Sequence, residues 1–501
     1  MTAQMDTLPS ARTAVAETAL GARTLKNFIG GQWLTAKGSG LLDVTNPATG
    51  EVLARVPLSG RAEVEAAVAA ATTALPNWRA CAIGERTEFI YALREKFRQR
   101  IDELAASITS EGGKVLSDAR AEVTRAIEVL EVACATPMTM QGRILDGVAR
   151  GISTETIRQP VGVCAAITPF NFPCMVPMWF LPFAIVCGNT FVLKPSEQVP
   201  LTSELMCHIL EEIGLPRGVV NVVHGAHDAV NAILDSPGIR AISFVGSVNT
   251  AKYIYRRAAE NGKRVQALGG AKNYMVVMPD AVVDKTITNI LGSAFGNAGQ
   301  RCMAGSVVVT VGSARQAIMD RLKEEAQKLV AGDGTDSKAS LGPVISRIAR
   351  DRIHECIESG VKEGAELLVD GRRPVGLPSG GNFVGPTILN NVTADMRVAR
   401  DEIFGPVLSV MHVDTLEEAI ELVNLDGLER EMPTRQLLDA FRLIEPGEFR
   451  TQCRDGITFA PDVSADLADP LGLQRRVELD LVDIGRGQDQ HGDDGDMQEA
   501  Q

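Results

Sequence analysis

Two patterns of apolar and polar positions run along the chain. From residue 63 to residue 135, apolar residues recur every three to four positions, which predicts amphipathic helices. From residue 162 to residue 268, short apolar runs typical of buried strands alternate with helical runs, which predicts βαβ units around a parallel sheet. The strands are expected at residues 163–167, 190–193, 219–223, 241–245 and 265–268, and the helices near residues 176–186, 202–213, 228–234 and 251–260.

A second α/β section follows. Its strands are expected near residues 274–278 and 307–311, and its helices near residues 285–295, 316–329 and 416–424. Residues 141–158 are polar and mixed, which predicts a hairpin outside the core. From residue 425 onward the apolar periodicity fades, and residues 485–501 hold too few apolar side chains to offset the entropy of ordering them. We therefore expect the end of the chain to be disordered.

Length and charge narrow the class of protein. A chain of 501 residues is too long for one compact core, so two or three domains are expected. The net charge of −13 argues against a nucleic-acid partner, which requires a basic surface. Residues 160–193 carry no charge and could span a bilayer by length, but five prolines would break such a helix. A buried strand–loop–helix–strand stretch is predicted there instead, and no membrane partner.

Cysteine and histidine usage indicates the compartment. The nine cysteines form no CxxC pair, which is typical of reduced thiols in the cytoplasm. The histidines include one close pair, His224 and His227, which we expect on the surface or in loops, and no metal site is expected. The first 23 residues contain Asp6 and Glu17 and lack an apolar core, so they resemble neither a secretory signal nor a transit peptide.

Cys302 is the candidate nucleophile. It follows Gly299-Gln300-Arg301 in a loop between an apolar helix and a strand, where the guanidinium of Arg301 is expected to lower the pKa of the thiol. Asn171 lies on a proline-stiffened loop after a strand, where its amide could donate to an oxyanion; a plain turn asparagine is the alternative. A thiolate that adds to an aldehyde carbonyl creates the tetrahedral carbon from which hydride can leave to a nicotinamide.

Two further motifs indicate nucleotide binding. Lys194 and Glu197 directly follow a strand, at the sheet edge where α/β proteins bind nucleotides. Glu197 could accept hydrogen bonds from ribose hydroxyls and would repel a 2′-phosphate, which favours NAD over NADP. Gly246 and Ser247 close another strand and lead into a helix whose N-terminal N–H groups could hold a pyrophosphate. The sequence contains no GxGxxG motif.

The order of these motifs resembles the aldehyde dehydrogenase superfamily. The resemblance begins near Asn27, includes residues 28–33, 46–50 and 401–406, and ends near Asn424. It implies an aldehyde dehydrogenase-like α/β fold that combines a Rossmann-type NAD-binding domain with an α/β catalytic domain. The implied organisation is a flexible segment at 1–24, an NAD-binding domain at 25–140 and 159–272, a bridging hairpin at 141–158, an incomplete catalytic domain at 273–424 and an atypical tail at 425–501.

The resemblance also implies cofactor contacts. Glu402 and Phe404 match the family residues at the nicotinamide ribose and ring. Thr168, Pro169 and Phe170 are the positions expected to line the same site. The family is homo-oligomeric, but the arm that bridges its subunits is not recognisable here.

One departure from the family pattern points to the second substrate. Hydrolytic members carry a general-base glutamate that opens a Glu-Leu-Gly-Gly-Lys motif, whereas residues 266–273 hold no carboxylate and place Leu268 or Ala267 there. Water would be poorly activated without that base, while a thiol such as that of coenzyme A needs less help. The pattern is similar to that of the CoA-acylating methylmalonate-semialdehyde dehydrogenases, especially in residues 187–197, 263–266 and 300–304.

Two arginines of this chain are candidates for binding a substrate that carries a carboxylate. Malonate or methylmalonate semialdehyde would be recognised by a guanidinium, and the resemblance assigns this role to Arg125 and Arg301. A solvated helix residue is the alternative for Arg125. The implied products are NADH, CO₂ and acetyl-CoA or propanoyl-CoA.

Two other interpretations remain at this point. One is a hydrolytic aldehyde dehydrogenase that uses another base. The other is an inactive chain that retains only nucleotide binding, because the family pattern stops after Asn424 and the following residues resemble a shifted reading frame.

Overall fold

The computed structural model describes residues 22–37 and 40–428, all of which belong to one unit that spans residues 1–431. The predictions for residues 1–21 and 429–501, including the disordered end, lie outside the described residues. Within the predicted flexible segment 1–24, Thr24 is described and forms an isolated bridge with Arg55.

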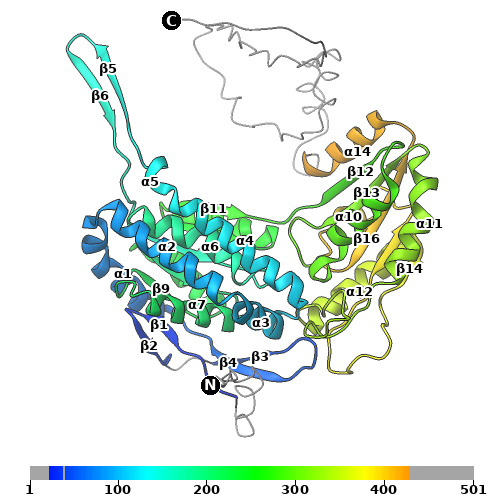
Figure 1. Cartoon of the computed structure of the whole chain (residues 1–501), viewed down its shortest axis with the longest axis horizontal. Coiled ribbons are helices and arrows are strands. Elements are labelled where there is room, and N and C mark those ends of the chain that lie inside the picture. The colour runs from blue at the N-terminus through cyan, green and yellow to red at the C-terminus, as the bar shows by residue number, and fades with distance from the viewer. Residues whose placement is uncertain (1–21, 38–39, 429–501) are drawn as a thin grey trace, which may run out of the picture. The chain divides into compact units, whose positions relative to one another are not determined.

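A seven-stranded sheet occupies the first half of the described chain (Figure 1). Its order is β11-β10-β7-β8-β9-β1-β2, and the five strands β7 to β11 run parallel, as the alternating pattern predicts. Their bounds are Val163–Ile167 for β7, Thr190–Lys194 for β8, Val220–Val222 for β9, Ile239–Val245 for β10 and Arg264–Leu268 for β11. The α/β fold class is therefore confirmed.

The sequence pattern does not predict the two strands at one edge of this sheet. β1 (Asn27–Ile29) pairs antiparallel with β9, and β2 (Gln32–Leu34) pairs antiparallel with β1. Gly30 and Gly31 have φ angles of 61° and 71°, which is the left-handed backbone that a two-residue hairpin turn requires. Strands of three residues are too short to show a period, so their membership of the sheet is a tertiary property.

Helices cover both faces of the seven-stranded sheet. Successive side chains of a strand point to opposite faces, so neighbouring residues of one strand pack against different helices. Phe191 and Leu193 of β8 pack with α2, α3, α4, α6 and α7, whereas Val192 packs with α1, α8 and α9. The bounds are Arg61–Ala80 for α1, Ile83–Gln99 for α2, Ile101–Gly112 for α3, Leu116–Cys134 for α4, Met175–Val186 for α6, Leu201–Glu212 for α7, His227–Asp235 for α8 and Val248–Glu260 for α9.

The apolar segment 160–193 forms β7, a loop, α6 and β8, as predicted. Pro182 lies inside α6, which has 12 residues. Among the described residues, none of the helices is long and apolar enough to cross a membrane.

A five-stranded sheet follows, in the order β12-β13-β16-β15-β14. The sequence predicts β12, β13, α10, α11 and α14, but not the strands β14 to β16 or the helix α12. The bounds are Asn273–Val277 for β12, Gly305–Val311 for β13, Glu366–Val369 for β14, Thr387–Asn390 for β15 and Val407–Val413 for β16. The helices are α10 (Val283–Phe295), α11 (Ala314–Gln327), α12 (Arg347–Lys362), α13 (Arg397–Arg400) and α14 (Leu416–Leu428).

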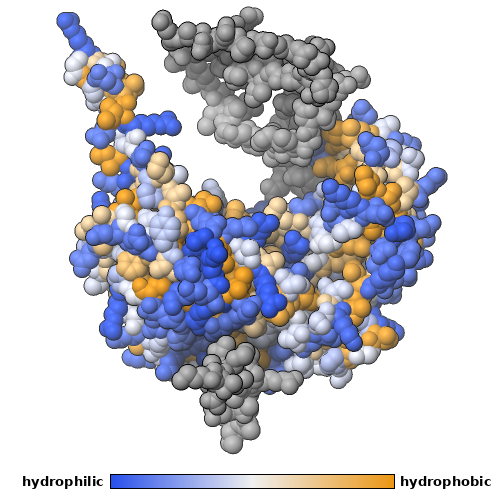
Figure 2. Space-filling model, in the orientation of Figure 1, coloured by the Kyte–Doolittle hydropathy of each residue, from blue (hydrophilic) through white to orange (hydrophobic). Residues whose placement is uncertain are grey.

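Two hairpins stand apart from these sheets. β3 (Leu41–Thr45) pairs with β4 (Val52–Pro57), and β5 (Arg143–Ala149) pairs with β6 (Ile152–Thr156) after the short helix α5 (Thr136–Thr139). The second is the predicted hairpin, and it projects outward from α5 (Figure 1). All of its strand residues are exposed, and Figure 2 shows apolar side chains along it; Ile144 is 74% exposed.

The prediction that both close histidines lie on the surface or in loops holds for His224 through its loop position, although His224 is buried. It follows β9 in a loop and is only 2% exposed. Its backbone N–H donates to Oδ1 of Asn27 in β1 at 2.8 Å. Burial lowers the pKa of His224 to about 4.

Candidate active site

A cavity of about 970 Å³ lies at the carboxyl ends of strands β7, β8 and β10. Parallel strands present these ends at one edge of the sheet, which is where α/β folds bind ligands. The loops after the three strands, together with two loops of the second sheet, bring most of the predicted site residues into this one cavity. These are Thr168, Pro169, Phe170, Asn171, Lys194, Glu197, Gly246, Ser247, Cys302, Glu402 and Phe404.

Cys302 lies half-buried in the segment that joins α10 to β13. Before it, Asn297 (φ 52°), Ala298 (φ 51°) and Gly299 (φ 70°) form three consecutive left-handed residues. A Cβ atom on Gly299 would lie 2.0 Å from the carbonyl oxygen of Gly405, so only glycine fits this close approach. The side-chain amide of Asn273 then donates to the carbonyl oxygens of Cys302 at 2.8 Å and of Ala304 at 2.9 Å.

Asn171 lies beside this segment and is 7% exposed. Its amide nitrogen donates to the carbonyl oxygen of Gln300 at 3.0 Å, which ties the loop after β7 to the loop of Cys302. An amide nitrogen carries two hydrogens, so one such bond leaves a second donor for an oxygen of the substrate. The arrangement fits an oxyanion donor.

The expectation that Arg301 lowers the pKa of Cys302 below its usual value needs correction. Burial is the largest influence and raises the pKa of the Cys302 thiol. The backbone N–H groups of Cys302 and Met303 lower it, and the charges of Glu402 and Arg301 oppose each other. Burial therefore outweighs the charge of Arg301 at this thiol.

Arg301 and Arg125 do not line the large cavity. The guanidinium of Arg301 donates to the carbonyl oxygen of Gly292 in α10 at 3.2 Å, and Arg301 lines a separate small hollow beside Cys302. Arg125 lies on α4 with a side chain that is 69% exposed, and it forms an ion pair with Glu128 at 2.6 Å. The structure places only Arg301 near the nucleophile.

Lys194, Glu197, Gly246 and Ser247 line the part of the cavity that we call the nucleotide cradle. Nζ of Lys194 donates to Oε2 of Glu197 at 2.7 Å. A Cβ atom on Gly246 would lie 2.4 Å from the ring of Phe244, so a side chain here would require that ring to shift. Ser247 is the residue before α9, and the N-terminus of that helix opens at the cavity.

Three lining residues escape sequence reasoning. Arg352 of α12 donates to the carbonyl oxygen of Glu402 at 3.2 Å and also to that of Ile403. The rings of His227 and Tyr253 stack with centroids 5.9 Å apart where α8 and α9 border the cavity. None of the three belongs to a recognised motif. The apolar periodicity of α12 is the signal from which Arg352 could have been found.

Glu402 lies against the glycine pair that follows β11. A Cβ atom on Gly270 would lie 2.2 Å from Oε2 of Glu402, and the backbone N–H of Ala271 donates to this carboxyl group. Burial is the largest influence and raises the pKa of Glu402. The cavity therefore contains a carboxyl group near Cys302, although residues 264–273 contain none.

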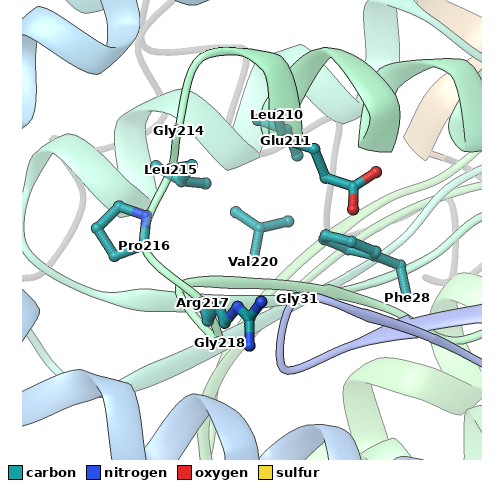
Figure 3. A pocket seen from close by; sticks show the side chains of 10 residues that line it. All are labelled: Phe28, Gly31, Leu210, Glu211, Gly214, Leu215, Pro216, Arg217, Gly218 and Val220. Carbon is teal, nitrogen blue, oxygen red and sulfur yellow. The ribbon is translucent and has the colours of Figure 1, made fainter.

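A second hollow of about 410 Å³ lies between α7, the loop after it and the turn of β1–β2 (Figure 3). Its one carboxylate, Glu211, accepts a hydrogen bond from the indole of Trp33 at 3.0 Å and contacts His208 at 3.2 Å. No nucleophilic side chain lines it. In the described part of the chain, no three His, Cys, Asp or Glu side chains gather as a metal site.

Comparison with known proteins agrees with this geometry. Residues 33–448 match the model of the aldehyde dehydrogenase family, past Asn424 where the motif pattern predicts that the resemblance ends. A malonate-semialdehyde dehydrogenase of Geobacillus thermodenitrificans is 50% identical over 80% of this chain and 83% of its own length.

Solved structures give the same result. A methylmalonate-semialdehyde dehydrogenase from Oceanimonas doudoroffii has a TM-score of 0.78 and 44% identity, covering 80% of this chain and 82% of its own. An aldehyde dehydrogenase from Bacillus cereus, solved in complex with NAD⁺, has a TM-score of 0.79 and 32% identity, covering 83% and 84%.

Proposed function

The chain belongs to the aldehyde dehydrogenase family, and from this premise we propose that it oxidises malonate or methylmalonate semialdehyde with NAD⁺ and transfers the acyl group to coenzyme A. One observation carries the proposal. Cys302 and Asn171 share a cavity with the nucleotide cradle, while the position of the hydrolytic base is occupied by Leu268 or Ala267.

The cradle fits a dinucleotide. The cavity is at the upper end of the roughly 300–1,000 Å³ range of ligand pockets. The turn at Gly246 leads to the N-terminus of α9, whose backbone N–H groups would bind a phosphate. Glu197 would accept hydrogen bonds from the adenosine ribose, and Glu402 and Phe404 would lie at the nicotinamide end. When bound, NAD⁺ supplies the hydride acceptor.

The residues of this chain carry the remaining chemistry. The Cys302 thiolate adds to the aldehyde carbon, and the negative oxygen that forms is stabilised by the amide of Asn171. Loss of hydride from that carbon leaves a thioester on Cys302. The β-carboxylate leaves as CO₂, and the carbanion that remains at the α-carbon takes up a proton from water. The thiol of coenzyme A then attacks the thioester, its proton passes to the departing Cys302 thiolate, and acetyl-CoA or propanoyl-CoA is released.

The substrate carboxylate needs a cationic partner close to Cys302. We assign this role to Arg301, which lies beside Cys302, because a guanidinium binds a carboxylate through two hydrogen bonds. For Arg125, which lies outside the cavity, the role rests on the family resemblance alone. Each must exchange a present partner for the substrate, since Arg301 donates to Gly292 and Arg125 pairs with Glu128.

The two sheets support the proposed domain division. The seven-stranded sheet ends at Leu268 and the five-stranded sheet begins at Asn273, which is the boundary proposed between NAD-binding and catalytic domains. The exposed apolar hairpin β5–β6 supports homo-oligomer formation. A cytoplasmic location stays a prediction from the cysteines.

One observation favours the hydrolytic alternative. Glu402 places a carboxyl group with a raised pKa beside Cys302, and such a group could activate water. Steady-state NADH formation from malonate semialdehyde with and without coenzyme A separates the two functions, with Cys302→Ala as the control. The proposal expects turnover only with coenzyme A, and equal turnover without it would contradict the proposal. NAD⁺ binding without NADH formation would instead support the inactive chain.

A further inference from the structure

Helix α4 contacts both loops that carry the proposed catalytic groups, although it lines neither the cavity nor the cradle. Oδ2 of Asp118, in its first turn, accepts a hydrogen bond from the backbone N–H of Asn297 at 2.9 Å. One turn later, Oε1 of Glu122 accepts from the backbone N–H groups of Cys174 at 2.9 Å and Met175 at 3.1 Å. The same helix is therefore bonded to the loop before Cys302 and to the loop of Asn171.

The loop before Cys302 is held in a costly conformation. Asn297 and Ala298 both adopt left-handed backbone angles, which residues with a Cβ atom rarely adopt and which persist only where the surroundings enforce them. The carboxylate of Asp118 bonds to the first residue of this left-handed run from outside the loop. Within the loop, Asn297 Nδ2 donates to the carbonyl oxygen of Gln300 at 3.1 Å.

The loop of Asn171 is held from the same helix through a buried ion pair. Nζ of Lys114, in the connection before α4, lies 2.5 Å from Oε2 of Glu122, and the two side chains are 3% and 0% exposed. The same ammonium group donates to the carbonyl oxygen of Asn171 at 2.9 Å. It also lies 4.0 Å from the ring centroid of Phe172. This ion pair fixes the backbone of Asn171.

We propose that Asp118 is a positioning residue, which sets the Cys302 loop in register with Asn171 by bonding to Asn297. This inference rests on the proposed function, because it assumes that Cys302 and Asn171 act on one carbonyl group. A displacement of about 1 Å between reacting groups can reduce a rate about 100-fold. Loss of the Oδ2 acceptor of Asp118 is therefore expected to reduce the reaction rate more than the free energy of unfolding.

A structural role for Asp118 is the rival explanation. An acidic side chain in the first turn of a helix stabilises the helix through its dipole, and that effect depends on charge alone. The two roles respond oppositely to two substitutions. Asp118→Asn keeps an oxygen acceptor near Asn297 but removes the charge, whereas Asp118→Glu keeps the charge but moves the acceptor by one methylene.

The experiment compares Asp118→Asn, Asp118→Glu and Asp118→Ala, with Ser117→Ala at the exposed neighbouring position as the control. The rate constant of the first-turnover NADH burst with malonate semialdehyde is measured together with the thermal midpoint and NAD⁺ affinity. The proposal expects a loss of about 10- to 100-fold in burst rate for the Ala and Glu variants, substantial rescue in the Asn variant, and unchanged NAD⁺ affinity. If Asp118 instead acts through the helix dipole, the thermal midpoint falls in the Ala and Asn variants and the Glu variant behaves like wild type. That result would overturn the proposal.

A second measurement does not depend on the reaction. The rate of Cys302 alkylation by iodoacetamide is followed by peptide mapping in the same variants. If wild type gives no NADH burst, the proposed function fails, but an alkylation rate that changes in the Ala and Glu variants and not in Asn still supports positioning. Equal alkylation rates in all variants would overturn it.

Discussion

The side-chain amide of Asn171 lies 3.0 Å from the carbonyl oxygen of Gln300, two residues before Cys302. This contact joins a loop that follows a strand of the first sheet to a loop that precedes a strand of the second. An amide donor and a thiol are thereby held together although 131 positions separate them in the printed sequence.

Replacing Asn171 by alanine is expected to lower kcat about 100- to 1,000-fold, or about 3 kcal/mol of transition-state stabilisation, because the oxyanion loses its donor. NAD⁺ affinity, measured by fluorescence titration, is expected to stay unchanged. Asn261→Ala, at the exposed position after α9 and outside the lining of the cavity, is the matched control for loss of an amide. A fall in kcat below threefold in Asn171→Ala would contradict the oxyanion role.

A side chain at position 270 is expected to displace Glu402. A Cβ atom there would meet Oε2 of Glu402 at 2.2 Å, so Gly270→Ala should displace that carboxyl group and lower the rate of NADH formation about 10- to 100-fold. Gly292→Ala is the control, since nothing lies within 4 Å of its Cβ position in α10. Equal rates in the two variants would show that Glu402 does not depend on Gly270.

The choice between NAD and NADP is expected to depend on Glu197. Its carboxylate would repel a 2′-phosphate, so Glu197→Gln should reduce the preference for NAD⁺ over NADP⁺ by about tenfold, or about 1.4 kcal/mol. Dissociation constants of both nucleotides are measured by calorimetry, with Gln198→Glu, which adds a carboxylate at the next position, as a comparison. An unchanged ratio in Glu197→Gln would remove Glu197 from cofactor selection.

The reactivity of the Cys302 thiol is expected to follow the two charges beside it. Glu402 raises the pKa of Cys302 and Arg301 lowers it. The pH profile of iodoacetamide alkylation at Cys302 should therefore move to lower pH in Glu402→Gln and to higher pH in Arg301→Gln. Shifts in one common direction would contradict this electrostatic account.

Acid is expected to destabilise the fold through His224. Burial lowers the pKa of His224 from 6.5 to about 4, so the folded state binds fewer protons than the unfolded state between these values. The contribution of His224 lowers the free energy of unfolding as the pH drops from 6.5 to 4, by roughly 3 kcal/mol at most. Below pH 4 the contribution of His224 is constant. Urea unfolding at several pH values measures the slope, which should decrease in His224→Gln; an unchanged slope would exclude His224.

The sequence predicts those parts of the site that follow from local pattern. Lys194, Glu197 and Gly246 directly follow apolar strands, and the rule that parallel strands end at one sheet edge then brings them together. Cys302 and Asn171 were likewise found from their short motifs. The family pattern supplied Glu402 and Phe404.

Other features depend on contacts that no local pattern encodes. Asp118 and Asn297 are far apart in the sequence, and the left-handed backbone at Ala298 opposes the ordinary preference of alanine. Arg352 escaped because α12 was not predicted. The pKa of Cys302 was expected to fall because Arg301 is visible in the sequence, whereas the burial that outweighs it is not.

In the proposed reaction, Cys302 forms a thioester that a thiol removes. The direct test is mass spectrometry of the Cys302 peptide after the protein is mixed with malonate semialdehyde and NAD⁺, without coenzyme A. An acetyl group is expected on the Cys302 peptide of the wild type and not on that peptide in Cys302→Ala. Addition of coenzyme A should remove this acetyl group and produce acetyl-CoA. Release of free acetate at the same rate with and without coenzyme A would contradict the proposed reaction.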